Sequence, residues 1–179
     1  SNQGDFHEGA NFAGVHTLPV ILMCENNKYA ISVPVEKQLA CERVSDRAVG
    51  YGMPGVTVNG NDPLEVYGAV KEAADRARRG EGPSLIETVS YRLTPHSSDD
   101  DDRSYRAPAE VAEAKTNDPI ITFGAYLKET GVLDDNLEKE INERVMKLVN
   151  EATDYAENAP YAQAEDALKH VYEEGMGAV

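Results

Sequence analysis

The sequence is short of cysteine and of basic residues, and each shortage disfavours a class of protein. Cys24 and Cys41 are its only cysteines and form no CxxC pair. A disulfide scaffold or a zinc site is therefore disfavoured, and free thiols in a reducing compartment are predicted. Lys and Arg number 17 against 32 Asp and Glu, which gives a net charge of −15. This balance disfavours nucleic acid as a partner, because nucleic-acid binding requires Lys and Arg side chains that displace counterions from the phosphates.

Long apolar runs are also missing from the sequence. No uninterrupted run approaches the roughly 20 apolar residues that a membrane span requires. No charged-then-apolar signal segment opens the chain either. We therefore expect a soluble, cytoplasmic protein that does not bind membranes.

A short apolar stretch that ends abruptly in polar residues is the most informative part of the chain. Residues 19–24 read PVILMC, which is typical of a strand buried on both faces of a parallel sheet. Glu25, Asn26 and Asn27 follow at once. Ligands of open α/β sheets bind at the carboxyl ends of strands, so this polar end is a candidate site. A buried parallel strand needs neighbours, and we expect sequence upstream of residue 1 to supply some of them.

Strands and helices alternate along the first half of the chain. The strongest start signal is Asp62 followed by Pro63 and, three residues after the cap, Glu65, which predicts a capping box. Small residues of the first helix, including Gly9 and Gly14, would let it lie close against a neighbouring backbone. The predicted elements are helices over 6–16, 44–51 and 62–79 and strands over 19–24, 56–59 and 85–91. Their order and short connections predict an α/β fold with a right-handed parallel sheet.

The second half of the chain has a different character. Residues 93–106 read LTPHSSDDDDRSYR and predict a mobile loop on the sheet edge that carries Asn27. Helices are predicted over 108–116, 119–129, 134–158 and 163–174. The long helix has an apolar stripe that we expect to be buried, formed by Ile141, Val145, Leu148, Val149 and Ala152. The chain thus divides into a partial α/β domain, residues 1–116, and a helical region, residues 117–179.

The spacing of residues alone leaves the chemistry of the strand end open. Asparagine and backbone carbonyl oxygens are hard ligands, suited to a magnesium ion that keeps water and phosphate oxygens in its shell. Asparagine is also ordinary in turns. Without further information, a turn at Asn26 and Asn27 is favoured over a metal site.

Longer stretches of the sequence resemble a known family. The stretch GDFHEGANFAGVHTLPVILMCENNKYAISVP resembles the second half of the thiamine-diphosphate motif in alpha subunits of 2-oxoacid dehydrogenases. In that motif a Gly-Asp-Gly triplet is followed roughly 30 residues later by Asn-Asn. The resemblance continues through NGNDPLEVYGAV, GEGPSLIET, YRLTPHSSDDDDRSYR and NEATDYAENAP. It therefore covers nearly the whole chain, and it is greatest to the bacterial branched-chain members.

The resemblance implies roles for four residues. Asn27 corresponds to the asparagine that ligates magnesium, and Tyr29 to the residue whose backbone carbonyl is a further metal ligand. His96 corresponds to a loop histidine that lies over the cofactor and acts in reductive acylation of the lipoyl group. Histidine suits this role because it exchanges protons near neutral pH, although without the resemblance His96 would be interpreted as a solvated loop residue. Ser97 falls where mitochondrial relatives are phosphorylated.

The sequence departs from the family pattern at two places. The Gly-Asp-Gly triplet is absent, and its acidic metal ligand would lie just before Ser1. Glu25 stands where some branched-chain relatives have an arginine that meets the diphosphate, and a carboxylate would repel that group. Part of the metal site is therefore expected outside these 179 residues.

The function implied by the resemblance is that of an alpha subunit of branched-chain 2-oxoacid dehydrogenase. Such enzymes use thiamine diphosphate and magnesium to decarboxylate branched-chain 2-oxoacids and pass the acyl group to lipoamide on a dihydrolipoyl acyltransferase. They are alpha2beta2 heterotetramers in which the beta subunit completes the active site. Residues 1–116 would be part of the cofactor-binding domain, and the 179 residues alone are expected to be inactive and without cofactor. Two alternatives stay open, namely pyruvate or acetoin as substrate, and a non-catalytic scaffold chain.

Overall fold

The structure, a computed structural model, describes residues 1–169 of the chain. It divides into two compact units, Ser1–Thr130 and Gly131–Val179. Helix α4 (Pro119–Glu129) belongs to the first unit, so this division lies later in the chain than the one predicted between residues 116 and 117. As a division between a cofactor-binding domain and a helical region, the predicted boundary stays a prediction.

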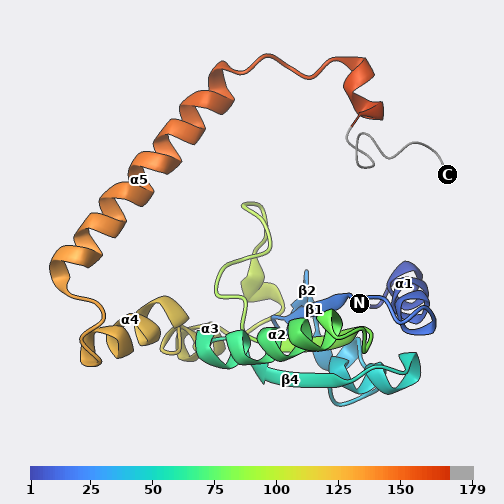
Figure 1. Ribbon diagram of the computed structural model, residues 1–179. Coiled ribbons are helices and arrows are strands. Elements are labelled where there is room, and N and C mark those ends of the chain that lie inside the picture. The colour runs from blue at the N-terminus through green and yellow to red at the C-terminus, as the bar shows by residue number, and fades with distance from the viewer. Residues whose placement is uncertain (170–179) are drawn as a thin grey trace. The chain divides into compact units, whose positions relative to one another are not determined.

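A three-stranded parallel sheet lies within the first unit (Figure 1). Its strands, in spatial order, are β1 (Ile21–Asn26), β5 (Ser84–Val89) and β4 (Gly55–Asn59). Asn26 and Asn59 both lie opposite Val89, so the carboxyl ends of the three strands meet at one edge. The predicted α/β fold with a parallel sheet is confirmed.

Strand β1 is less buried than predicted. In the described residues it pairs with β5 alone, and its Met23 is 45% exposed. The central strand is β5, where Leu85 and Ile86 are fully buried. Burial on both faces is therefore not seen for residues 19–24 in the described residues, and burial by neighbours from upstream of residue 1 stays a prediction, because an apolar run indicates a strand but not the number of its neighbours.

Helices cover both faces of the sheet. The elements concerned are α1 (Gly4–Val15), the 3-10 helix η2 (Val44–Tyr51) and α2 (Pro63–Arg78). Leu85 packs in one cluster with Ala10 of α1 and Ala48 of η2. Ile86, the next residue of β5, lines a small cavity with Ala73 of α2. Because successive residues of a strand point to opposite faces, the sheet lies between the layer of α1 and η2 and the layer of α2.

The start of α2 has one of the two hydrogen-bond patterns of the predicted capping box. Asp62 Oδ1 accepts hydrogen bonds from the backbone N–H groups of Leu64 at 2.8 Å and Glu65 at 3.2 Å. Glu65 does not return a bond to Asp62, and its carboxylate accepts from the N–H of Asn59 at 3.0 Å. The predicted cap is thus confirmed. The prediction of a reciprocal bond from Glu65 is wrong, because the Glu65 carboxylate bonds to the end of β4 instead.

Helix α1 approaches the end of η2 closely, as its small residues predict. A Cβ atom added at Gly14 would collide with the backbone carbonyl oxygen of Tyr51. A Cβ added at Gly9 would meet nothing within 4 Å. Only Gly14 is therefore required for this packing.

We expect Gly14→Ala to lower the free energy of unfolding by about 2 kcal/mol, because a rigid backbone atom occupies the space of the new methyl group. Gly9→Ala is the matched control. It should leave stability unchanged or raise it by up to about 1 kcal/mol, because alanine is the better helix former. Urea unfolding of both variants measures the difference, and equal stabilities would contradict the close packing.

Short elements complete the first unit. Strands β2 (Tyr29–Ala30) and β3 (Val33–Pro34) form a small antiparallel pair. The remaining elements are the 3-10 helices η1 (Val35–Lys37) and η3 (Asp102–Ser104) and the helix α3 (Pro108–Lys115). Helix η3 is the only regular element that residues 93–106 contain in the structure.

The second unit contains α5 (Asp135–Asn158) and the 3-10 helix η4 (Ala164–Leu168). Asp134 caps α5 by accepting from the N–H of Leu137 at 2.8 Å. The apolar stripe of α5, predicted to be buried, is exposed at all five positions, including Val145 and Leu148. The helix predicted over 163–174 is a 3-10 helix of 5 residues, and residues 170–174 lie outside the described part. Within residues 1–169, no helix has the length and apolarity needed to cross a membrane.

Candidate functional site

The polar end of β1 forms a tight turn held by two asparagine side chains. Asn26 Oδ1 accepts from the N–H of Lys28 at 3.2 Å, and Asn27 Oδ1 accepts from the N–H of Tyr29 at 3.1 Å. Lys28 has a left-handed backbone, with φ 72°. Asparagine side chains stabilise such turns by bonding to the backbone two residues on. The turn interpretation of this stretch is thus correct, and Asn27 Oδ1 remains a candidate for binding a metal.

The turn borders a cavity of about 160 Å³ that also contains the first residues of the chain. Asn27, Tyr29, Ser1 and Asn2 all line this cavity. Arg47 fixes the first two residues by donating to the Ser1 carbonyl at 2.6 Å and to Asn2 Oδ1 at 2.8 Å. Residues that are 25 to 28 positions apart in the sequence are therefore brought to one site.

The oxygen atoms at this cavity fit magnesium better than a softer metal. An amide oxygen has two lone pairs, so Asn27 Oδ1 can accept from Tyr29 and still ligate a cation. Amide and carbonyl oxygens are the hard ligands that magnesium takes, together with water and phosphate oxygens. Among residues 1–169, no group of three or more His, Cys, Asp and Glu is placed to hold a metal. Asn27 and Tyr29 can therefore supply part of a magnesium shell.

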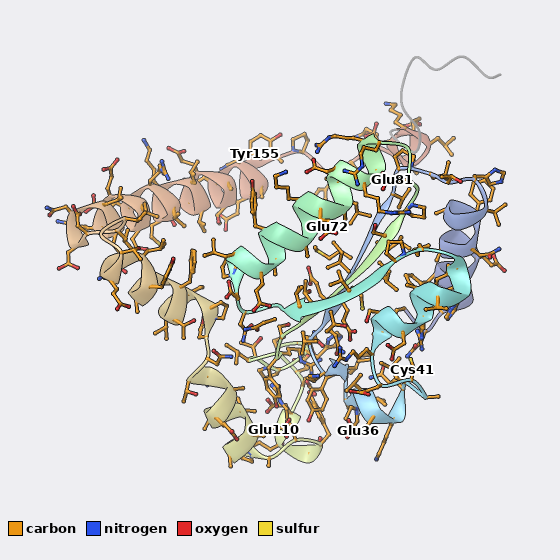
Figure 2. All side chains as sticks on the ribbon, turned by 60° about the horizontal axis from the view of Figure 1, so that its bottom comes forward. Glu36, Cys41, Glu72, Glu81, Glu110 and Tyr155 are labelled. Atoms are coloured by element: carbon orange, nitrogen blue, oxygen red, sulfur yellow. The ribbon has the colours of Figure 1, made fainter. Side chains whose placement is uncertain are left out.

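The side chain of Tyr29 is anchored far from the turn in sequence. Its hydroxyl donates to Glu110 Oε1 at 3.0 Å, and the hydroxyl of Tyr91 donates to the same oxygen at 2.8 Å. Glu110 belongs to α3 and is labelled in Figure 2. Burial and the hydrogen bond to Glu110 raise the pKa of Tyr29 to about 12, which keeps the phenol protonated. The guanidinium groups of Arg92 and Arg106 lie 5.7 and 5.8 Å from the Tyr29 ring centre, within the range of cation–π attraction.

The loop over residues 93–106 starts beside the turn, as predicted. The N–H of Arg92 donates to the carbonyl of Asn27 at 3.2 Å. His96 and Ser97 are exposed on the loop, and the backbone N–H of His96 donates to Asp100 Oδ2 at 2.8 Å. No hydrogen bond within the described residues joins the His96 imidazole to Asn27. The structure thus brings the start of the loop to the site, while the implied role of His96 stays a prediction.

Three of the four consecutive aspartates make hydrogen bonds or ion pairs within the loop. Asp100 accepts from the hydroxyl of Tyr105 at 2.5 Å, and this bond and the N–H of His96 lower the pKa of Asp100. Asp101 pairs with Arg103 at 2.7 Å. Asp102 pairs with Arg106 at 2.6 Å. The acidic run thus contributes specific contacts, and the mobility predicted for the loop stays a prediction.

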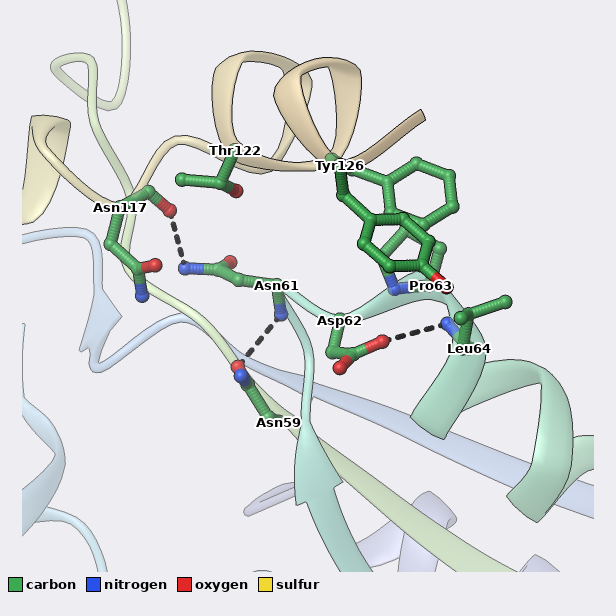
Figure 3. A pocket seen from close by; sticks show the side chains of 9 residues that line it. Asn59, Asn61, Asp62, Pro63, Leu64, Asn117, Thr122 and Tyr126 are labelled. Atoms are coloured by element: carbon green, nitrogen blue, oxygen red, sulfur yellow. Dashed lines mark hydrogen bonds between the residues drawn. The ribbon is translucent and has the colours of Figure 1, made fainter. Parts of the chain in front are cut away.

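A second, larger cavity lies at the carboxyl end of β4, near the start of α2 (Figure 3). It has a volume of about 330 Å³ and is lined by Asn59, Asn61 and Tyr126, among others. Asn61 closes one side by donating through Nδ2 to the carbonyl of Asn117 at 3.0 Å. Asn27, Tyr29 and His96 do not line this cavity, so the smaller cavity at Asn27 is the better candidate for the predicted chemistry.

Glu87 is a candidate site residue that the sequence interpretation missed. It lies in the middle of β5 with an exposed fraction of 1%, and its carboxylate accepts from the side chain of Asn26 at 2.7 Å. A lone carboxylate within the strand sequence SLIETV was the available signal, because charged groups are rarely buried without a partner.

Comparisons with known proteins agree with this arrangement. Residues 1–165 match the dehydrogenase E1 component family. Over 172 residues the chain is 74% identical to the 2-oxoisovalerate dehydrogenase subunit alpha of Bacillus subtilis, covering 96% of this chain and 52% of that protein. Over 174 residues it is 42% identical to the 3-methyl-2-oxobutanoate dehydrogenase subunit alpha of Mycobacterium tuberculosis and to the pyruvate dehydrogenase E1 component subunit alpha of Bacillus subtilis, covering 97% of this chain and 47% of each of them.

The chain spans about half the length of these curated relatives. The family match nevertheless extends over most of the chain, including the turn at Asn27, the loop with His96 and the helices that follow. The chain therefore belongs to the dehydrogenase E1 component family.

Proposed function

We propose that this chain is part of the alpha subunit of a branched-chain 2-oxoacid dehydrogenase. The observation that carries the proposal is the 74% identity to the 2-oxoisovalerate dehydrogenase subunit alpha, against 42% to a pyruvate dehydrogenase alpha subunit. The complete enzyme would decarboxylate branched-chain 2-oxoacids and transfer the acyl group to lipoamide. Its partners would be a beta subunit, in an alpha2beta2 heterotetramer, and a lipoyl-bearing dihydrolipoyl acyltransferase. A cytoplasmic location is supported by the free thiols of Cys24 and Cys41.

The cofactors in this proposal are thiamine diphosphate and magnesium. Asn27, through its amide oxygen, and Tyr29, through its backbone carbonyl, would hold the magnesium ion that neutralises the diphosphate. Ser1 lines the same cavity, so a Gly-Asp-Gly segment joined before it would enter at this point and could supply the carboxylate ligand. Thiamine diphosphate supplies, when bound, the electron sink that decarboxylation requires.

His96 would act on the lipoyl group. Its exposure and its place in the loop that starts beside Asn27 support the role. An exposed imidazole can donate a proton or a hydrogen bond to an incoming lipoyl sulfur. The hydrogen bond from the His96 backbone to Asp100 fixes the backbone of the residue, not its ring.

The substrate is tested by steady-state kinetics of the complete alpha subunit assembled with its beta subunit. We expect kcat/KM with 3-methyl-2-oxobutanoate to exceed that with pyruvate by at least about tenfold, because a pocket shaped for a branched side chain gains from each added methyl group. An artificial electron acceptor removes the need for the acyltransferase. A preference for pyruvate would overturn the branched-chain assignment and favour the pyruvate alternative.

Cofactor binding distinguishes the non-catalytic scaffold alternative from the proposed enzyme. A scaffold chain would bind no thiamine diphosphate in the assembled complex at any magnesium concentration. The proposed enzyme would bind it with a dependence on magnesium that calorimetry can measure.

A further inference from the structure

Glu87 is a buried carboxylate at the centre of the sheet. Its exposed fraction is 1%, and it lies in β5 opposite Cys24 of β1 and Thr57 of β4. Burial of an unpaired carboxylate is costly, and no basic side chain pairs with it among the ion pairs of the described residues. The charge must therefore be stabilised by hydrogen-bond donors.

The two oxygens of Glu87 have different partners. Oε2 accepts from the hydroxyl of Thr57 at 2.9 Å and from the backbone N–H of Ser45, near the start of η2, at 3.2 Å. Oε1 accepts from Nδ2 of Asn26 at 2.7 Å. Burial alone would raise the pKa of Glu87, but these donors and the N–H of Val44 together lower it, so the carboxylate stays ionised at neutral pH.

Asn26 connects this buried charge to the turn at the candidate metal site. Its Nδ2 faces Glu87, while its Oδ1 accepts from the N–H of Lys28. An ionised carboxylate can only accept hydrogen bonds, so Glu87 permits a single orientation of the Asn26 amide group. That orientation is the one that places an acceptor at Lys28, the left-handed residue between Asn27 and Tyr29.

We propose that Glu87 is a positioning residue for the magnesium site, acting through the amide of Asn26 to fix the turn that presents Asn27 and Tyr29. The inference rests on the proposed function, because it concerns the same site. Neither Glu87 nor Asn26 touches the metal in this proposal. Groups that orient metal ligands in this way commonly change metal affinity by about 10- to 100-fold when they are replaced.

The first test is Glu87→Gln in the complete alpha subunit assembled with its beta subunit. Glutamine can keep a carbonyl oxygen toward Thr57 and Ser45, but it then presents an NH₂ group to the NH₂ group of Asn26. Asn26 must turn its amide over and lose its bond to Lys28. We expect the magnesium concentration for half-maximal thiamine diphosphate binding to rise at least about tenfold, as measured by calorimetry.

The second test exchanges donor and acceptor between the two positions. In the double variant Glu87→Gln with Asn26→Asp, the glutamine NH₂ group can donate to one aspartate oxygen, and the other aspartate oxygen can accept from Lys28. The hydrogen bond between positions 87 and 26 is then restored with donor and acceptor exchanged, and the bond from the Lys28 N–H is restored in its original direction. We expect the magnesium requirement to return to within about threefold of the unchanged protein, a non-additivity that a purely structural loss would not produce.

Thr57→Val is the matched control, since Thr57 bonds the same carboxylate but does not contact the turn. It should lower the urea midpoint of the cofactor-free protein to a similar extent as Glu87→Gln, yet leave the magnesium requirement within about twofold. Should Glu87→Gln fail to fold, Asn26→Ala tests the same link from its other end and should raise the magnesium requirement likewise.

Three results would overturn the inference. One is a folded Glu87→Gln protein with the magnesium requirement of the unchanged protein, and another is a Thr57→Val protein with an equally raised requirement. The third is a double variant that is no better than Glu87→Gln alone. If the unchanged assembly itself shows no magnesium-dependent binding of thiamine diphosphate, the proposed function fails, and the inference that rests on it fails too.

Discussion

Replacing Asn27 with alanine in the complete alpha subunit should raise the magnesium concentration needed for thiamine diphosphate binding by more than about 100-fold. The change removes an oxygen ligand from the proposed metal shell. It also removes the acceptor for the N–H of Tyr29, so the carbonyl of Tyr29 loses its fixed position. Calorimetric titration with magnesium at saturating cofactor measures the effect directly.

Asn59→Ala is the control that distinguishes the effect of losing a turn from the effect of losing a metal ligand. Asn59 also ends a strand of the sheet, and its Oδ1 accepts from the N–H of Asn61 at 3.0 Å, as Figure 3 shows. Its replacement removes a turn of the same kind that lies outside the cavity at Asn27. The magnesium requirement of this variant should stay within about twofold of the unchanged protein. Equal effects of the two replacements would mean that Asn27 serves only the turn.

Signals confined to neighbouring residues predicted the fold well. Asp62 marks the start of α2 because a cap bonds to N–H groups only two or three residues away. The parallel sheet followed from the order of strands and helices. Gly14 was one of several small residues in α1, and the collision of a Cβ atom with Tyr51 distinguishes it from Gly9.

Features that depend on distant residues could not be predicted in this way. The edge position of β1 depends on which strands pair with it, and the exposed stripe of α5 depends on what packs against it. Tyr29 and Glu110 are 81 positions apart, and no local pattern indicates that they meet. Glu87 and Asn26 are 61 positions apart, although the lone carboxylate of β5 indicated that a partner must exist.

The resemblance to a family supplied what spacing could not. From the residues alone, Asn27 was better explained as part of a turn, and the structure has it in that turn. The cavity shared with Ser1 and Tyr29 is what makes a second role possible. The assignment of a metal to this cavity therefore depends on the family and on the geometry together, and on the magnesium titrations above.

Arg106→Ala should cause the largest loss of stability of any single replacement in the loop. The side chain of Arg106 is fully buried, and it donates to Asp102 through two nitrogens at 2.9 and 2.6 Å and also to the carbonyl of Arg92. Its guanidinium also lies over the rings of Tyr29 and Tyr91. Alanine leaves Asp102 and the Arg92 carbonyl without this donor, so we expect the free energy of unfolding to fall by about 4 kcal/mol.

Arg103→Ala is the matched control for Arg106, because it removes the neighbouring arginine pair in the same loop. Arg103 is 75% exposed and pairs with Asp101, which is 63% exposed, so water already solvates both charges and the loss should stay within about 0.5 kcal/mol. Urea unfolding distinguishes the two variants, and added salt should change the contribution of Arg103 but hardly that of Arg106, since buried pairs are screened less. Because Arg106 also contacts the ring of Tyr29, the Arg106→Ala variant should have a raised magnesium requirement as well. The magnesium requirement of the Arg103→Ala variant should not change. A stable Arg106→Ala protein would show that the loop is held to the rest of the first unit by other contacts.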